Sequence, residues 1–524
     1  MNGARALLQT LVDAGVDVCF ANPGTSEMHF VAALDDAPGM RGVLALFEGV
    51  ATGAADGYAR MTGRPAAVLL HLGPGLGNGL ANLHNARRAR SPVVAVVGDH
   101  ATYHKRFDAP LESDIEAAAR SVSGWFRASR SSRDVAGDAA DAVAAALGPP
   151  GRIATLVLPA DASWSEGAAV AAVRPPPPPL AVPDAILGEL AGVLRSGEPA
   201  VLFLGGRALC ERGLVAAARI AAATGAALLC ETFPARLERG AGLPAIDRLP
   251  YFAEQAAARL AGYRPVILVD APPPVSFFAY PGKPSELVAP GAAVHRLAAG
   301  GDDVLGALAA LADRLGAAGS PPVTAGSPPV AAARRPAPPT GALTVETAAH
   351  AIGALLPERA IVSDEAHTSS LFLPGATAGA PRHDWLTLTG GAIGDGMPVA
   401  IGAAVACPDR KVVCLEADGS AMYTPQALWT MARERLDITT VIFHNAAYAI
   451  LRLELQRVGA GAGGPKARDM FSLSRPALDF VALARSMGMP GERATTADEL
   501  VAQLRRAFAE PGPHLIEAMV PPLV

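Results

Sequence analysis

The feature that most constrains the fold is a repeated unit, in which a short apolar run ends at a glycine or polar residue and leads into a helix. In the first third of the chain, such runs are predicted to form strands at residues 16–21, 43–47, 66–70 and 93–97. Unbroken apolar runs of this length are typical of strands that are buried on both faces. Repeated β-turn-α units build parallel sheets, so the sequence predicts an α/β fold made of doubly wound parallel sheets.

Two proline-rich segments divide the chain of 524 residues into blocks. Residues 174–183 include five consecutive prolines and are expected to be extended, and residues 319–340 are rich in Pro, Gly and Ala. The blocks at 1–170, 185–318 and 341–524 each have the length of one domain. The first and third blocks echo each other in sequence pattern, which predicts two related domains and a smaller, Rossmann-like central domain.

Charge and cysteine content exclude several classes of protein. A formal net charge of −5 gives no electrostatic reason to expect a nucleic acid or an anionic membrane as partner. The chain has no uncharged apolar stretch of about 18 residues, and its beginning lacks the pattern of a signal peptide. The five cysteines lie singly in apolar runs, which indicates buried thiols in a reducing compartment, so a cytoplasmic location is expected.

Polar side chains follow two strands of the third block. An apolar strand at 412–415 leads to Asp418, and the next predicted strand, at 438–443, leads to Asn445. Because neighbouring parallel strands end at the same edge of a sheet, we expect the carboxylate and the carboxamide to lie close together. Oxygen ligands beside a glycine turn and a helix N-terminus suit a Mg²⁺-bound diphosphate. The alternative is an ordinary turn, in which the aspartate caps the next helix.

A second candidate residue, Glu48, lies in the first block. It closes the apolar strand at 43–47 and precedes a helix of small residues at 49–61. A carboxylate in such surroundings is costly to bury unless it is paired. The sequence therefore predicts a functional carboxylate there.

These motifs resemble those of the thiamine diphosphate (ThDP) enzymes, whose metal motif is Gly-Asp-Gly-Ser followed, after a helix and a strand, by Asn-Asn. The resemblance implies that Mg²⁺ is bound by Asp418, Asn445 and the carbonyl of Ala447. Ala417 and His444 replace the first glycine and the first asparagine of the motif, and neither position is a metal ligand in the family. The implied cofactor contacts at this edge also include Gly419, Ser420 and Tyr448.

The segment EGVATGAADGYAR at 48–60 resembles the pyrimidine-binding segment of the same family. The resemblance implies that Glu48 hydrogen-bonds the aminopyrimidine of ThDP and promotes removal of the thiazolium C2 proton. In the loop GGAIGDGMP at 390–398, the carbonyl of Gly391 and the side chain of Ile393 match the positions that hold the pyrimidine. A tight turn before a helix is the alternative for this loop.

The resemblance assigns roles to the three blocks in order: a pyrimidine-binding domain, a central domain and a diphosphate-binding domain. It implies a homodimer or homotetramer with the active site at the dimer interface. The small residues of the helix that follows Glu48 are expected to pack against the partner subunit. These residues are Gly49, Gly53, Ala54 and Ala55.

Within the family, the chain is most similar to the branch of acetolactate synthase, benzoylformate decarboxylase and pyruvate oxidase. Thr25 and His71 match positions that line the reaction space of the decarboxylase, and a neutral imidazole there could relay a proton. Phe277 stands in the segment where that enzyme has a second histidine, and Glu454 replaces an aromatic residue of its pocket. These differences favour a substrate that is smaller or more polar than a phenyl keto acid.

FAD, which acetolactate synthases bind in the central domain, is not expected here. The Gly205-Gly206 turn lacks the pattern G-x-G-x-x-G of a dinucleotide site. The glycine-rich segment 455–469 is predicted to be a mobile lid, and a tolerated surface insertion is the alternative.

The leading hypothesis is ThDP- and Mg²⁺-dependent decarboxylation of a 2-oxo acid with carboligation to a second carbonyl, as in acetolactate synthase. A simple 2-oxo acid decarboxylase is the first alternative. A ThDP-fold protein with weak or regulatory activity is the second, because of the two departures in the metal motif. A dehydrogenase that binds a nucleotide near Gly205 is the third.

Overall fold

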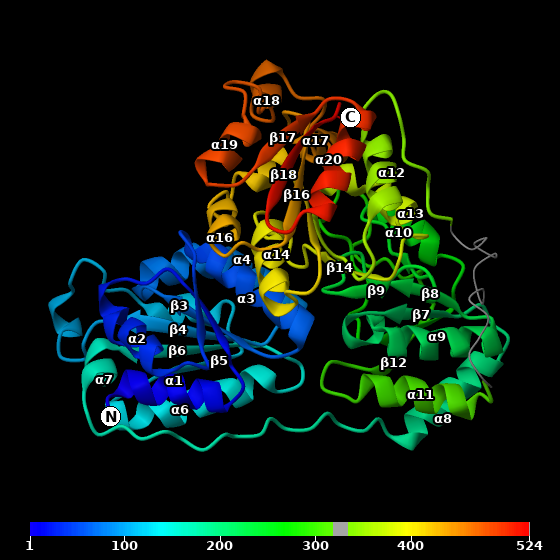
Figure 1. Cartoon of the computed structure of the whole chain (residues 1–524). Coiled ribbons are helices and arrows are strands. Elements are labelled where there is room, and N and C mark those ends of the chain that lie inside the picture. Colours follow the sequence, from blue (N-terminus) through cyan, green and yellow to red (C-terminus); the bar gives the residue numbers. More distant parts are fainter. Residues whose placement is uncertain (318–333, 523–524) are drawn as a thin grey trace.

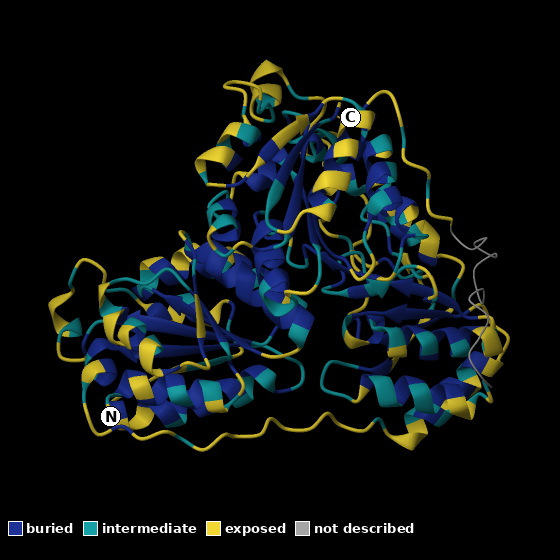
Figure 2. Ribbon diagram, viewed as in Figure 1, coloured by how far each residue is buried: buried dark blue, intermediate teal, exposed yellow. Residues whose placement is uncertain are grey.

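The computed structural model describes residues 1–317 and 334–522. In this part of the chain, three sheets are each flanked by helices and lie at three corners of the molecule (Figure 1). The exposed segment that contains the five prolines runs without helix or strand between the first and second sheets (Figures 1 and 2). The second predicted linker, 319–340, falls largely outside the described residues.

The first sheet has six parallel strands in the order β2-β1-β3-β4-β6-β5. Its central strands are buried along their whole length, as their apolar sequences predict. The strands are β1 (Val18–Ala21), β2 (Arg41–Leu44), β3 (Ala66–Leu70), β4 (Val93–Asp99), β5 (Trp125–Ala128) and β6 (Ile153–Pro159). The helices are α1 (Gly3–Asp13), η1 (Thr25–Glu27), α2 (Met28–Ala33), η2 (Leu34–Asp36), α3 (Glu48–Thr62), α4 (Leu72–Ala89), η3 (Lys105–Phe107), α5 (Ile115–Arg120), α6 (Ser132–Leu147) and α7 (Ala160–Trp164).

The second sheet has five parallel strands in the order β10-β8-β7-β11-β12. The strands are β7 (Val201–Leu204), β8 (Ala227–Cys230), β10 (Asp247–Arg248), β11 (Pro265–Val269) and β12 (Ala293–Ala298). The helices are α8 (Asp184–Arg195), η4 (Gly206–Leu209), α9 (Glu211–Thr224), α10 (Ala253–Leu260) and α11 (Val304–Arg314).

The third sheet has seven strands in the order β17-β18-β16-β15-β13-β14-β9. Six are parallel, and the edge strand β9 (Leu237–Arg239) comes from the central block and runs antiparallel to β14. The other strands are β13 (Ile361–Glu365), β14 (His383–Thr387), β15 (Val412–Ala417), β16 (Ile438–His444), β17 (Gly491–Ala494) and β18 (His514–Met519). The helices are α12 (Val345–Leu355), η5 (His367–Ser370), α13 (Leu373–Ala376), α14 (Gly396–Ala406), α15 (Asp418–Ala421), α16 (Ala427–Arg433), α17 (Ala449–Arg457), α18 (Pro465–Asp469), α19 (Phe480–Ser486) and α20 (Ala497–Ala509).

Helices α3 and α14 pack against each other at the centre of the molecule, between the first and third sheets (Figure 1). A Cβ atom at Gly57 would lie 2.1 Å from the carbonyl oxygen of Val399, and one at Gly402 would lie 1.9 Å from that of Ala54. Glycine is therefore required on both helices for this close approach. Of the four small residues expected to pack against a partner subunit, Gly53 and Ala54 contact α14 of the same chain, so the prediction is wrong for these two.

Two glycine-rich segments contain helix. Directly after β3, α4 begins at Leu72 and continues through four glycines. The segment 455–469 contains the end of α17 and all of α18, and is partly helical. No helix among residues 1–317 and 334–522 is long and apolar enough to cross a membrane.

Candidate active site

At the carboxyl edge of the third sheet, the structure brings Asp418 and Asn445 together. β15 and β16 are parallel neighbours, and the two residues follow their ends. The Oδ2 atom of Asp418 accepts hydrogen bonds from the backbone N–H groups of Asn445 (3.1 Å) and Ala446 (2.6 Å), and Oδ1 accepts one from Gly419 (2.8 Å). Burial raises the pKa of Asp418, and these N–H groups oppose that shift. The carboxylate is therefore held by the backbone of the neighbouring strand end.

The oxygen atoms at this edge fit a Mg²⁺ ion. Ala446 adopts a left-handed conformation (φ +56°), and the side-chain oxygen of Asn445 accepts the N–H of Ala447 at 2.9 Å, so the turn is tight. A carboxylate, a carboxamide and a carbonyl are the hard oxygen ligands that Mg²⁺ prefers. The described residues contain no group of three or more His, Cys, Asp or Glu side chains that could hold a metal. A Mg²⁺ ion here would therefore need further oxygen ligands, which a diphosphate and water supply.

Two further contacts shape the short helix α15 that Asp418 begins. A Cβ atom at Gly419 would lie 2.3 Å from Cε1 of Tyr448, so the ring of Tyr448 requires a glycine at this position. The hydroxyl of Ser420 lies 2.9 Å from Nε2 of His367, whose φ of +51° is unusual for a residue with a side chain. Partial loss of solvent around the ring lowers the pKa of His367, although the side chain is still 30% exposed.

His367 was not singled out from the sequence. It directly follows the buried strand β13, two residues after Glu365. Like Asp418 and Asn445, this histidine is a polar residue that follows a buried strand, so the same sequence pattern indicates it.

The structure gives a reason for His444, one of the two departures from the family motif. His444 is buried, and its Nδ1 lies 2.6 Å from Oε1 of Glu517 on β18. The other carboxylate oxygen of Glu517 accepts a hydrogen bond from Nε of Arg493 at 2.8 Å. Burial raises the pKa of Glu517, but the hydrogen bonds from His444 and Arg493 outweigh it, and the pKa is lowered overall. His444 therefore joins the end of β16 to β18 and β17.

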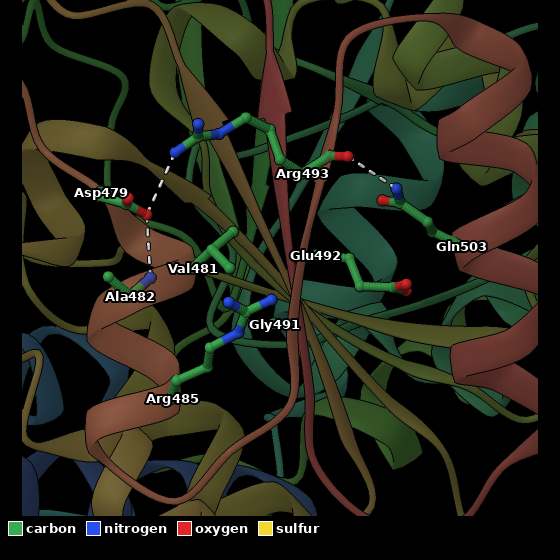
Figure 3. A pocket seen from close by; sticks show the side chains of 8 residues that line it. All are labelled: Asp479, Val481, Ala482, Arg485, Gly491, Glu492, Arg493 and Gln503. Carbon is green, nitrogen blue, oxygen red and sulfur yellow. Dashed lines mark hydrogen bonds and ion pairs between the residues drawn. The ribbon is translucent and has the colours of Figure 1, made fainter.

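Arg493 also borders an open surface pocket of about 440 Å³ between α19, β17 and α20 (Figure 3). Its guanidinium lies 3.2 Å from Asp479, and its carbonyl accepts a hydrogen bond from Gln503 at 2.8 Å. Glu492 is bonded to Arg506 at the rim. Because these charges are paired with one another, the pocket is not a candidate active site.

The first sheet supplies Glu48, the first residue of α3. Its side chain is buried, and Oε2 accepts a hydrogen bond from the side chain of Asn78 on α4 at 3.0 Å. Among the described residues, no cationic side chain lies within 4.0 Å of it. A Cβ atom at Gly75 would lie 3.2 Å from Oε1 of Glu48 and 3.3 Å from Cβ of His71. The carboxylate and the histidine therefore flank the same glycine.

His71 is the N-cap residue of α4 and is bonded to a buried carboxylate that the sequence analysis missed. Its Nδ1 lies 2.8 Å from Oε2 of Glu27 and 3.3 Å from the hydroxyl of Ser26. Thr25, the other candidate in this region, is exposed at the start of η1. Glu27 gave no signal of its own, because an acidic residue in a turn is ordinarily solvated.

The predicted pyrimidine loop is held in place from two sides. Glu365 accepts hydrogen bonds from the N–H groups of Gly394 (2.7 Å), Asp395 (2.8 Å) and Gly396 (2.5 Å), and burial raises its pKa to about 7. Gly391 has a φ of +77°, which favours glycine, and Ile393 is half-buried. The loop therefore has a backbone conformation fixed by a buried carboxyl group.

Helix α4 connects this loop to Glu48. The side-chain amide of Asn82 donates to the carbonyls of Gly49 (2.8 Å) and Gly394 (3.0 Å). The side chain of Asn85 donates to the carbonyl of Ala392 at 2.8 Å. Since Asn78 of the same helix binds Glu48, α4 sets the position of the loop relative to the carboxylate within one chain.

The central block contributes aromatic side chains to this region. A Cβ atom at Gly391 would lie 3.1 Å from the ring of Phe277, which packs edge-on to Phe233 at 5.6 Å between ring centres. The hydroxyl of Tyr280 donates to Glu454 of α17 at 2.9 Å. Phe277 and Glu454, the two differences from the decarboxylase pattern, thus belong to contacts between the central block and the third block.

The turn at Gly205 and Gly206 does not fit a dinucleotide. The N–H of Gly206 donates to Glu231 at 3.1 Å, and the N–H of Arg207 donates to Asp270 at 2.8 Å. Burial raises the pKa of Glu231 to about 7. Carboxyl groups of the chain itself therefore take the N–H groups that would bind a phosphate.

Comparisons with known proteins match the two regions of the chain that contain Glu48 and Asp418. A family model described as "Thiamine pyrophosphate enzyme, N-terminal TPP binding domain" matches residues 1–119, and one described as "Thiamine pyrophosphate enzyme, C-terminal TPP binding domain" matches residues 375–518. The chain belongs to the thiamine pyrophosphate enzyme family. The predicted family is therefore confirmed, and ThDP-binding domains lie at both ends of this enzyme.

Two curated relatives match along the chain. The enzyme is 64% identical, over 525 residues and 100% of both chains, to a Mycobacterium tuberculosis protein named "Putative acetolactate synthase large subunit IlvX". It is 30% identical, over 531 residues and 96% of both chains, to the benzoylformate decarboxylase of Pseudomonas aeruginosa.

The predicted α/β fold is also confirmed. The structure of a ThDP-dependent 4-hydroxybenzoylformate decarboxylase from Rhodococcus jostii RHA1 has a TM-score of 0.87 at 24% identity, and 99% of each chain is covered.

Proposed function

We propose that this thiamine pyrophosphate enzyme decarboxylates a 2-oxo acid and joins the product to a second carbonyl compound, as an acetolactate synthase does. The observation that carries the proposal is the buried carboxylate of Glu48, which has a single side-chain partner and no cationic partner among the residues that the structure describes. A buried, unpaired carboxylate lowers stability, so it is expected where chemistry requires it. The name of the 64% identical relative supports the choice of reaction.

The residues at the two edges have complementary roles in this proposal. ThDP supplies the electron sink for decarboxylation when it is bound. Glu48 would hydrogen-bond its aminopyrimidine ring, and the loop at Gly391 and Ile393 would orient that ring. At the other edge, Mg²⁺ and the diphosphate are held by Asp418, Gly419, Ser420, Asn445, Ala447 and Tyr448.

On the substrate side of this proposal, His71 holds or moves a proton at its Nε2 atom. Thr25, the residue after the Gly24 that adjoins the ring, lines the reaction space. Phe277, a residue of the central block, packs over the loop at Gly391. It stands in the segment where benzoylformate decarboxylase has a second histidine, so this proposal has one proton donor fewer. With Glu454 nearby in place of an aromatic residue, a 2-oxo acid that is smaller or more polar than a phenyl keto acid is favoured.

A simple 2-oxo acid decarboxylase is the second candidate. The turn at Gly205 and Gly206 favours it, because carboxyl groups of the chain take the N–H groups that could otherwise bind a phosphate of FAD. The 30% identity to a benzoylformate decarboxylase agrees with this alternative. A weakly active or regulatory protein has less support, because the bond between His444 and Glu517 accounts for one of the two departures that motivated it.

The assembly in this proposal is a cytoplasmic homodimer or homotetramer with the active site at the dimer interface. Neither a nucleic acid nor a membrane is a partner, in keeping with the net charge of −5.

The test is a CO₂-release assay with ThDP and Mg²⁺ across a panel of 2-oxo acids, with and without aldehyde or 2-oxo acid acceptors. Mass spectrometry of the products separates the two reactions: a 2-hydroxy ketone indicates carboligation, and an aldehyde alone indicates simple decarboxylation. Absence of CO₂ release from every acid in the panel would contradict both candidates.

A further inference from the structure

The pair formed by Glu27 and His71 is unusual because the carboxylate is completely buried and no lysine or arginine of the described segments forms an ion pair with it. Glu27 is 0% exposed. Its Oε2 accepts the backbone N–H of Gly24 at 2.7 Å and lies 2.8 Å from Nδ1 of His71, and the hydroxyl of Ser26 donates to Oε1. The buried carboxylate is therefore bonded to Nδ1 of this histidine.

Two glycines on separate segments make room for this pair. A Cβ atom at Gly98, near the end of β4, would lie 1.7 Å from Oε1 of Glu27. A Cβ atom at Gly24 would lie 2.3 Å from Nδ1 of His71. The carboxylate and the ring thus occupy a space formed by the ends of β1, β3 and β4, and neither can be displaced by a small local shift.

The arrangement is not a nucleophilic triad. In a triad, the serine and the carboxylate bind opposite nitrogens of the histidine, whereas here Ser26 and Glu27 both lie at Nδ1. In the described part of the chain, Nε2 of His71 makes no hydrogen bond to protein, and the side chain is 23% exposed. The free nitrogen is therefore the one available to a ligand.

We infer that Glu27 is a positioning residue, which fixes His71 as the Nδ1–H tautomer and keeps Nε2 free to accept or return a proton during turnover. An ionised carboxylate can only accept, so the ring must donate from Nδ1. The carboxylate also stabilises the imidazolium that forms when Nε2 takes a proton. This inference rests on the proposed function, because it gives His71 a proton to move.

The experiment compares the wild type with Glu27→Gln, Glu27→Asp and a control, Asp138→Asn. Asp138 is a buried carboxylate of α6, and its hydrogen bonds in the described structure are to Ser129 and Arg127, not to His71. We expect Glu27→Gln to lower kcat by at least about 100-fold, since the amide can hold the opposite tautomer, with KM changed by less than about threefold. Glu27→Asp should recover part of kcat, and Asp138→Asn should stay within about twofold of the wild type.

A spectroscopic measurement separates positioning from mere folding. In protein labelled with ¹⁵N-histidine, with the His71 signals assigned from a His71→Asn variant, the neutral wild-type ring should carry its proton on Nδ1. The ring in Glu27→Gln should shift toward Nε2–H. A wild-type ring protonated on Nε2, or a folded Glu27→Gln variant with unchanged kcat, would overturn the inference.

If Glu27→Gln does not fold, the wild-type spectrum alone decides between the two tautomers. Failure of the proposed function has a different signature, since the wild type would then release no CO₂ from any 2-oxo acid.

Discussion

Two regions of the molecule each bury a carboxylate, Glu48 at the first sheet and Asp418 at the carboxyl edge of the third sheet, and they differ in how that carboxylate is hydrogen-bonded. Asp418 accepts three backbone N–H groups, so the fold itself satisfies most of its hydrogen-bonding capacity. Glu48 has one side-chain partner, Asn78, and no cation nearby among the described residues. Burying a carboxylate with so few partners lowers stability. The difference indicates that Asp418 supports the structure in addition to any role with a metal, whereas Glu48 is explained by function.

The largest expected effect comes from Glu48→Gln. Because the proposed function assigns proton transfer to this group, turnover should fall by about 1,000-fold, and the midpoint of thermal unfolding without ligands should stay the same or rise. Steady-state kinetics and thermal unfolding measure the two effects. Glu231→Gln, the same change at a half-buried carboxyl group of the central block, is the control and should keep turnover within about threefold. If Glu48→Gln turns over substrate at the wild-type rate, Glu48 is not explained by function and does not differ from Asp418 in this respect.

Asp418→Ala should lower stability even when no cofactor or metal is present. The N–H groups of Gly419, Asn445 and Ala446 lose their acceptor, which is expected to cost about 3 kcal/mol in the free energy of unfolding. Urea unfolding in the presence of EDTA measures this loss. Asp418→Asn retains one acceptor oxygen and should lose less. If Asp418→Ala unfolds at the same urea concentration as the wild type, the backbone contacts do not contribute as proposed.

His383, at the start of β14 in the third sheet, is a buried base with no proposed chemical role. It tests how burial alone changes the stability of the protein. Burial, followed by the nearby Arg239, lowers the pKa of His383 to about 4, and Nε2 has no partner in the described structure. Because the folded pKa is below the unfolded value, the unfolded state takes up the proton first as the pH falls below about 6.5. This histidine should therefore cost about 2 kcal/mol of stability at pH 5, and nothing above pH 7.

The comparison variant is His383→Asn, which keeps a donor near the carbonyl of Pro381, the partner of Nδ1 at 2.7 Å. The difference in stability between the variant and the wild type should grow in favour of the variant from pH 7 to pH 5. A constant difference over this range would show that His383 does not titrate as described.

The smallest effect is expected from Gly75→Ala, on the helix that lies beside Glu48. The new methyl group would lie 3.2 Å from Oε1 of Glu48 and 3.3 Å from Cβ of His71, so both must move by a few tenths of an ångström. We expect about a tenfold loss of kcat/KM without loss of stability. Gly77→Ala, on the same helix with open space around it, should keep kcat/KM and gain about 0.5–1 kcal/mol. Equal kinetics for both variants would contradict the proposed position of the site.

The sequence predicted the strands well where burial is complete and local. The strand at Ala66–Leu70 was predicted with its observed bounds, because an unbroken apolar run flanked by polar residues leaves little choice. The start of α4 was missed because Gly73 and Gly75 have low helix propensity. Tertiary packing overrides that propensity, since the asparagines of this helix bind α3 and the loop at Gly391.

The candidate site was predicted from residues that follow strands in recognisable motifs. Glu27 and His367 were missed because their importance depends on contacts with residues far away in the sequence. The contact between Phe277 and Gly391 likewise joins two blocks, and no local sequence pattern predicts it. The same is true of β9, which leaves the central block to complete the third sheet.

The central claim is that the two edges serve one cofactor, and calorimetric titration with ThDP tests it most directly. The titration is performed with and without Mg²⁺ on the wild type, Asp418→Asn and Glu48→Gln. The account predicts that ThDP binds the wild type only with Mg²⁺ and that Asp418→Asn weakens binding by at least about tenfold. Binding of inorganic pyrophosphate with Mg²⁺ should be weakened by Asp418→Asn but not by Glu48→Gln. Absence of ThDP binding, or Mg²⁺-independent binding that Asp418→Asn leaves unchanged, would contradict it.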